Sequence, residues 1–132
     1  MLTRATSVLP ENVERVAEAV IGAAIAVHRE LGPGFLERIY EDALCIELTT
    51  RTIRFEREKP IGVLYRGVLI PGQRVDLVVE DLVVVELKAI TKVDPIHEAI
   101  VLSYLKTMKL RLGLLINFHA RLLKEGLQRI AL

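Results

Sequence analysis

A run of four apolar residues, Leu82-Val83-Val84-Val85, constrains the fold of this chain more than any other feature. The run does not alternate between apolar and polar residues, as a strand with one face in water does. Its β-branched residues, and the Glu80-Asp81 pair before it, are typical of a strand that follows a turn. The run therefore predicts a strand covered on both faces, with helices packed on the two sides of its sheet.

Two helices are predicted before this strand. From Glu11 to Leu31 the apolar residues recur at three- and four-residue steps, which indicates an amphipathic helix. Gly32-Pro33 ends it, because glycine adopts the left-handed conformation after a helix and proline cannot continue it. A second helix is expected to begin near Gly34 or Phe35. Its predicted inner side consists of Leu36, Ile39, Tyr40, Ala43, Leu44 and Leu48.

A third helix is predicted after the apolar strand, with Asp94 as its cap, Pro95 at its first position and an end near Lys109. The next apolar run, Leu112–Phe118, is typical of a central strand. A helix between two strands is the crossover that parallel pairing requires. We therefore expect Leu82–Leu87 and Leu112–Phe118 to lie parallel in one sheet.

The remaining strands are expected to form an antiparallel meander, interrupted at Gly62, Gly67, Pro71-Gly72 and Glu80-Asp81. The expected runs are Thr52–Phe55, Ile61–Tyr65, Val68–Ile70, Val75–Val79 and Leu82–Leu87. Residues 122–132 are interpreted as a short terminal strand or a helical turn. The fold class is thus α/β, with one domain over residues 1–132, a mixed sheet flanked by helices, and an irregular N-terminus at residues 1–10.

Composition excludes several classes of protein. The single cysteine, Cys45, rules out an intrachain disulfide, fits a reducing compartment and is expected to be a buried, inert thiol. The stretch Val20–Val27, made of apolar residues and glycine, is far shorter than the roughly 20 residues of a membrane span. The three histidines, His28, His97 and His119, lack metal-ligand spacing. These features predict a cytoplasmic protein without a membrane segment.

Charge is distributed unevenly along the chain. The 18 basic and 17 acidic residues give a net charge of +1, yet residues 99–132 hold six basic side chains against one acid. Such asymmetry permits an anionic partner without requiring one. Within this segment, Lys106, Lys109 and Arg111 are the candidates for contact with a nucleic-acid backbone, although lysines of this kind are more often simply solvated.

Three charged residues, Asp76, Glu86 and Lys88, lie in the most apolar part of the chain. Glu86 and Lys88 are two residues apart on one strand, so their side chains share a face. A three-residue turn would place Asp76 opposite Glu86, whereas a two-residue turn would place it opposite Val85. The sequence leaves both registers open.

In the first register two carboxylates and a lysine meet on one face. Carboxylates, a backbone carbonyl and water suit Mg²⁺ or Mn²⁺, which activates water and stabilises charge on a phosphoryl oxygen. Lys88 could orient the attacking water or neutralise the transition state. The alternative is an ordinary ion pair between Lys88 and Glu86 or Asp76.

The segment Gly34 to Tyr40 reads G-x-x-E-x-x-Y, and together with Asp76 and Glu86-Leu87-Lys88 it resembles the GxxExxY protein family, a branch of the PD-(D/E)XK nuclease-like superfamily. The resemblance runs from about Val13 to Ile130. Further matching segments are Leu31–Gly34, Pro95–Ala99 and Gly113–Phe118.

The resemblance implies a restriction-endonuclease-like core with a metal held by Asp76, Glu86 and the backbone carbonyl of Leu87, with Lys88 as the catalytic lysine. It also implies that Glu37 approaches the metal. The competing interpretation of Glu37 is that of a helix-capping acid, at the third helical position after a Gly34 cap.

Two further positions follow from the resemblance. Tyr40 is expected to be a packing residue with a hydrogen-bonded hydroxyl. On the third helix Tyr104 matches the family, but Ile100 stands where many relatives carry glutamine. The departure puts nuclease competence, but not the fold, in question.

The sequence thus predicts a Mg²⁺- or Mn²⁺-dependent nuclease that hydrolyses DNA or RNA and binds it weakly, without sequence preference. One alternative is an inactive protein of the same fold that binds nucleic acid or another protein. Another is a small homo-oligomeric interaction protein whose carboxylates only form ion pairs. The modest net charge and few aromatic residues argue against strong nucleic-acid affinity.

Overall fold

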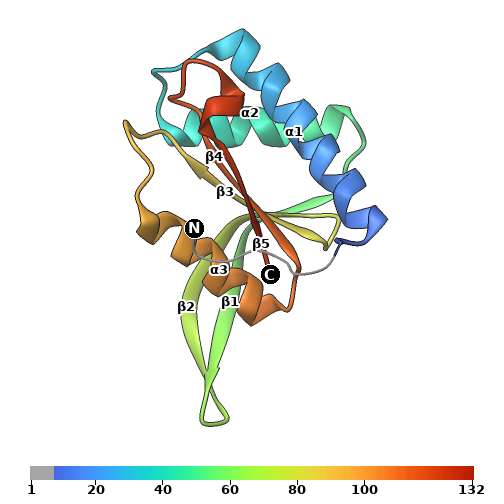
Figure 1. The fold of residues 1–132 in the computed structure, drawn as a ribbon, viewed down its shortest axis with the longest axis vertical. Coiled ribbons are helices and arrows are strands. Elements are labelled where there is room, and N and C mark those ends of the chain that lie inside the picture. Colours follow the sequence, from blue (N-terminus) through green and yellow to red (C-terminus); the bar gives the residue numbers. More distant parts are fainter. Residues whose placement is uncertain (1–7) are drawn as a thin grey trace.

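The computed structural model describes residues 8–132, so most of the predicted irregular N-terminus (residues 1–10) lies outside the described residues. Three helices, five strands and one short 3₁₀ helix follow one another along this part of the chain (Figure 1). They are α1 (Glu11–Leu31), α2 (Glu37–Thr50), β1 (Phe55–Tyr65), β2 (Val68–Val79), β3 (Val83–Lys88), α3 (Pro95–Met108), β4 (Leu112–Asn117), η1 (Leu123–Gly126) and β5 (Leu127–Ala131). No helix among these residues is long and apolar enough to cross a membrane.

The five strands form one mixed sheet in the order β1-β2-β3-β4-β5. Neighbouring strands are antiparallel except β3 and β4, which are parallel and joined by α3. Alternate residues of β3 pack on opposite sides: Val83 and Val85 join the core beneath α1 and α2, while Val84 joins the core beneath α3. The predicted α/β fold with helices on both faces is therefore confirmed.

Helix α1 ends where the sequence predicts, but α2 begins later than predicted. The left-handed Gly32 (φ 69°) ends α1 as expected, but Gly34 also has a positive φ, and α2 begins only at Glu37. Leu36 and Ile39, predicted on the inner side, are 77% and 42% exposed. Leu36 is exposed because it is the cap residue outside the helix, and Ile39 because it lies in the first turn on the side away from the core.

A buried tyrosine holds this loop in place. The Tyr40 hydroxyl donates a hydrogen bond to the Gly32 carbonyl and accepts one from the Phe35 N–H. Its ring stacks on Phe118, with the ring centroids 4.6 Å apart. Tyr40 is therefore the packing residue with a hydrogen-bonded hydroxyl that the sequence indicates, and it fixes where α2 starts.

The chain forms two long strands, β1 and β2, where the sequence predicted four short ones. The predicted breaks at Gly62 and Pro71-Gly72 lie opposite each other, where the pairing of the two strands shifts register. Such a β-bulge accommodates a proline and a surplus residue without ending the strands. Of the predicted run Thr52–Phe55, only Phe55 belongs to a strand, since Thr52 has φ 60° and lies in the turn after α2.

The connection between β2 and β3 settles the register that the sequence left open. Val79 pairs with Val83 across a three-residue turn, Glu80-Asp81-Leu82. Glu80 and Asp81 both have positive φ angles, of 52° and 58°. Extended by one position away from the turn, this register places Asp76 opposite Glu86.

Candidate metal centre

The candidate site lies where β2 and β3 separate. Their observed pairing ends at Leu77 and Val85, and the next residues in register are Asp76 and Glu86. Here the Asp76 carboxylate, rather than backbone of β2, accepts the Leu87 N–H, at 2.9 Å. The separation opens room between the strands, and it places a carboxylate where a ladder hydrogen bond would otherwise lie.

Glu86 and Lys88 point to the same side of β3, as predicted. The Lys88 ammonium lies 3.5 Å from Glu86 Oε2, so the ion pair is present. Glu86 is only 6% exposed, and its Oε1 is a buried oxygen without a hydrogen-bond partner among the described residues. A buried carboxylate oxygen without a partner is costly, and a bound cation would remove that cost. The donor set of hard oxygens therefore fits Mg²⁺ or Mn²⁺.

The two carboxyl groups also perturb each other's titration. Burial, and then the charge of Asp76, raise the pKa of Glu86 to about 8, against the opposing effect of Lys88. Burial also raises the pKa of Asp76, although the Leu87 N–H partly offsets the shift. Without metal, this pair therefore holds a proton more tightly than ordinary carboxyl groups do.

Two acids that sequence reasoning missed lie beside Asp76. Glu41 of α2 and Glu58 of β1 each bring one carboxylate oxygen to within 4.8 Å of the others and of Asp76. Burial raises the pKa of Glu41 to about 7, partly opposed by Arg57, whose Nε lies 2.7 Å from Glu41 Oε2. Together with Glu86, these residues form what we call the acid cluster: Glu41, Glu58, Asp76 and Glu86.

Only one of the missed acids left a signal in the sequence. Glu41 follows Glu37 by four residues, so both lie on one face of α2. Glu58 occupies an unusual backbone position, with φ 52° inside a strand. A non-glycine residue in that conformation is uncommon, and sequence patterns do not reveal it.

Glu37 lies close enough to the acid cluster to feel its charges. Burial raises its pKa, Lys88 lowers it and Asp76 raises it. As a helix cap, however, Glu37 is not at the predicted third position, because it is the first residue of α2 and Leu36 is the cap. An acid in the first turn still interacts favourably with the helix dipole.

Helix α3 covers the site on the face of the sheet opposite α2. Tyr104 is buried there, and its pKa rises to about 12 through burial and the charges of Glu86 and Asp76. Ile100 packs in the same apolar cluster. A glutamine does contact α3, but it comes from β2 and not from the helix. Gln73 Nε2 lies 3.5 Å from Ser103 Oγ, and Gln73 Oε1 is buried without a hydrogen-bond partner among the described residues.

The basic residues predicted to contact nucleic acid, Lys106, Lys109 and Arg111, lie elsewhere. Lys106 and Lys109 are exposed at the end of α3, and Arg111 precedes β4 with its Nε 2.7 Å from the Leu132 carbonyl oxygen. Because β4 runs parallel to β3, its first residue lies beside Val83, at the far end of the strand from Lys88. The structure therefore does not bring these residues to the acid cluster.

The residues discounted as ligands have structural partners. His28 Nε2 lies 2.8 Å from the Ala120 carbonyl oxygen, His97 Nδ1 accepts the Asp94 N–H, and His119 Nε2 lies 2.9 Å from the Phe35 carbonyl oxygen. Cys45 is buried, as expected, and burial raises its pKa to about 11, which disfavours the reactive thiolate.

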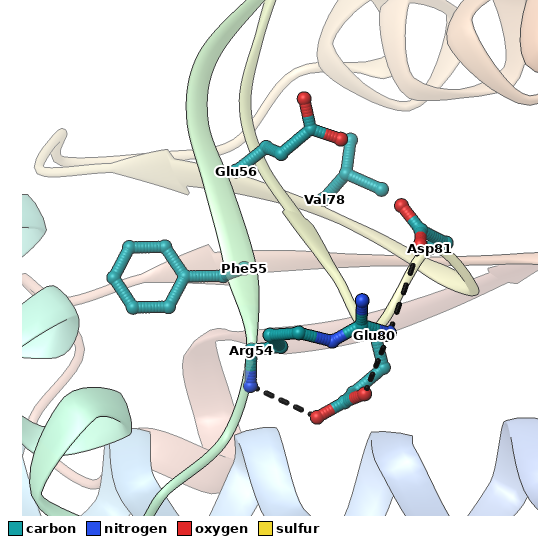
Figure 2. A pocket seen from close by; sticks show the side chains of 6 residues that line it. All are labelled: Arg54, Phe55, Glu56, Val78, Glu80 and Asp81. Carbon is teal, nitrogen blue, oxygen red and sulfur yellow. Dashed lines mark hydrogen bonds and ion pairs between the residues drawn. The ribbon is translucent and has the colours of Figure 1, made fainter.

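A surface hollow of about 220 Å³ lies at the base of the β1–β2 hairpin, where β1 begins and β2 ends (Figure 2). Its lining residues are Arg54, Phe55, Glu56, Val78, Glu80 and Asp81. Glu80 accepts hydrogen bonds from the Arg54 backbone N–H and guanidinium. These contacts hold the turn between β2 and β3, so the hollow has a structural explanation and is separate from the acid cluster.

Comparison with known proteins agrees with this geometry. A model of the PD-(D/E)XK nuclease superfamily matches residues 14–130, nearly the whole chain. Searches of curated proteins and of solved structures found no match. The match covers all three helices almost completely and every strand of the sheet, including both sides of the separated strands. The chain therefore belongs to the PD-(D/E)XK nuclease superfamily.

Proposed function

We propose that this protein is a divalent-metal-dependent phosphodiesterase that hydrolyses DNA or RNA, and that it belongs to the GxxExxY branch of its superfamily. The single observation that carries the proposal is the position of Glu86 beside Asp76, one step in register beyond the last paired residues, with Glu86 Oε1 buried and without a hydrogen-bond partner among the described residues. An ordinary ion pair with Lys88 satisfies only the other oxygen of Glu86. Membership in a nuclease superfamily supports the same function.

In this proposal Asp76, Glu86 and the Leu87 carbonyl hold Mg²⁺ or Mn²⁺. When bound, such an ion activates water and offsets negative charge on a phosphoryl oxygen. Hydrolysis joins the water oxygen to phosphorus and breaks one phosphorus–oxygen ester bond. The Lys88 ammonium, held beside Glu86, orients the water or stabilises the charge that develops on the phosphate.

Neighbouring residues support these roles. We assign Glu37 and the missed acids Glu41 and Glu58 to the cation-facing side of the site, because their carboxylates surround Asp76 or respond to its charge. Gly34, through its left-handed backbone, sets the start of α2 and so the position of Glu37. Tyr104 stays protonated and lines the α3 side.

Carboxylate and lysine substitutions test the proposal. Asp76→Asn keeps the side-chain shape but removes a charge that holds a dication, so cleavage with Mg²⁺ or Mn²⁺ should vanish while the fold survives. Lys88→Ala should still bind metal, with cleavage about a hundred- to a thousand-fold slower, as for loss of one electrostatic contact in a transition state. The measurement is cleavage of single- and double-stranded DNA and RNA. Asp81→Asn, an exposed carboxylate far from the site, is the matched control.

A second readout separates binding from chemistry. Mn²⁺ should raise the melting temperature of wild type and of Lys88→Ala, because a ligand that binds only the folded state stabilises it, and should do so far less for Asp76→Asn. Equal cleavage by wild type and both variants would reveal a contaminating nuclease. Metal binding without cleavage of any substrate would contradict the proposed phosphodiesterase activity.

The specific alternative is a nucleic-acid- or protein-binding module without activity, which Ile100 favours because a helix glutamine is absent there. In that outcome Ile100→Gln is the first substitution to try for restoring cleavage. We further propose that the protein acts in the cytoplasm, where its free thiol Cys45 would stay reduced.

A further inference from the structure

The outer part of the β1–β2 hairpin, residues 61–73, projects beyond the rest of the sheet, and we call it the arm (Figure 1). Extending the β2–β3 register places Lys88, the last residue of β3, opposite Arg74. Residues of β2 before Arg74 therefore have no β3 beside them. The arm is a two-stranded ribbon, and ribbons of this kind are at best marginally stable in water by themselves.

Both faces of the arm are apolar. Val63 pairs with Ile70 and Tyr65 with Val68, and these four side chains share the face that continues from Ile61. Ile61 packs beneath α3, but the four residues beyond it do not. Beyond Ile61, the large apolar side chains of the arm are all 37–70% exposed: Val63, Leu64, Tyr65, Val68, Leu69 and Ile70.

We propose that the arm is a dimerisation surface that packs against the same arm of a second copy of this chain. Its charge disfavours a nucleic-acid occupant, since Arg66 is the one charged residue between 61 and 73 and phosphate contacts need several. Arg66 moreover lies over the Tyr65 ring, 5.9 Å from its centre. A second copy supplies a surface of the same uncharged, apolar kind across a two-fold axis.

The exposed area is large enough for such a contact. Taken with their exposed fractions, the four side chains that share one face (Val63, Tyr65, Val68 and Ile70) offer on the order of 450 Å² per copy, which is in the range of the largest apolar patch of a typical monomer. Two such faces together would bury roughly 900 Å², an area typical of weak, transient protein interfaces. The arm thus accounts for a weak dimer that dissociates on dilution, and this inference stands independently of nuclease activity.

Analytical ultracentrifugation over a concentration series tests the inference. Wild type should sediment as a dimer that dissociates on dilution, and Val68→Lys should raise the dissociation constant at least tenfold. Ile46→Lys is the matched control: Ile46 is 67% exposed on α2, against 64% for Val68, and its substitution should leave the dimer intact. Circular dichroism checks the fold, and the milder Tyr65→Ser replaces Val68→Lys if the latter does not fold.

Two kinds of result would overturn the inference. One is a wild type that stays monomeric well above micromolar concentration, or a dimer that Val68→Lys and Tyr65→Ser leave unchanged. The other is a monomer that binds DNA or anionic lipid vesicles in a way that depends on Val68, which would assign the arm to those partners instead.

Discussion

Glu86 lies at a site where burial and a second carboxylate both oppose its ionisation, and Lys88 is the cation that partly offsets them. In the unfolded chain the same group titrates near its ordinary pKa of about 4.3. The pKa of Glu86 in the folded protein is raised to about 8. Between about pH 4.3 and pH 8 the folded protein therefore holds a proton at Glu86 that the unfolded chain has lost. Glu41, whose pKa is raised to about 7, behaves in the same way.

This difference predicts the pH dependence of stability without metal. Since the folded state binds more protons than the unfolded chain between about pH 4.3 and pH 8, the free energy of unfolding falls as pH rises through that window. Wild type should therefore melt at a lower temperature at pH 8 than at pH 6 in the presence of a chelator. Glu86→Gln should reduce this difference, whereas Glu98→Gln, on α3, should leave it unchanged. A melting temperature that rises steadily from pH 6 to pH 8 would contradict the proton-binding argument.

How far the site could be predicted depends on which residues local patterns expose. Asp76, Glu86 and Lys88 stand out because charge is rare within apolar strands. Glu58 could not be found in that way, because its left-handed backbone places it beside Asp76. Whether these residues bind metal stays a prediction.

At the scale of elements, the turn between β2 and β3 carries strain that one substitution can relieve. Both Glu80 and Asp81 adopt positive φ angles, which cost L-residues roughly 1–2 kcal/mol and glycine little. The Glu80 side chain bonds to the Arg54 backbone and guanidinium, whereas among residues 8–132 Asp81 makes an ion pair with Arg54 at the longer distance of 3.8 Å.

Asp81→Gly should therefore raise the free energy of unfolding by about 1 kcal/mol, because it releases the strain and loses little else. Glu80→Gly should gain less or lose stability, since it also breaks the bonds to Arg54. Urea unfolding at one pH measures both variants. A more stable Glu80→Gly than Asp81→Gly would show that the Arg54 contacts contribute nothing.

Elements were predictable where their ends are set by nearby residues. Gly32 ends α1 and Asp94-Pro95 starts α3, as the sequence indicated. The start of α2 instead depends on a tyrosine hydroxyl that reaches back to the loop, and the continuity of β1 and β2 depends on a bulge shared by two strands. Such contacts join residues whose pairing is invisible along the sequence.

At the scale of the whole molecule, the predicted nucleic-acid contacts Lys106 and Lys109 lie far from the acid cluster, near the end of the sheet where β4 begins. We expect nucleic-acid affinity to fall steeply between low and moderate salt, because phosphate contacts release counterions. Replacing Lys106 and Lys109 with alanine should weaken binding and reduce the slope of log affinity against log salt by about two for duplex DNA. Fluorescence anisotropy measures both effects, with Lys124→Ala as the control from the same basic segment. An affinity that does not change with salt would reject this surface.

The acid cluster has a consequence for how long the folded protein survives. Its members come from α2, β1, β2 and β3, so their mutual repulsion arises only when four separate elements have come together. Interactions that form so late change the unfolding rate more than the folding rate. We expect Glu58→Gln in metal-free protein to slow unfolding in stopped-flow denaturant jumps and to leave refolding nearly unchanged. A cation bound there would act in the same direction, lengthening the lifetime of the native state without hastening its formation.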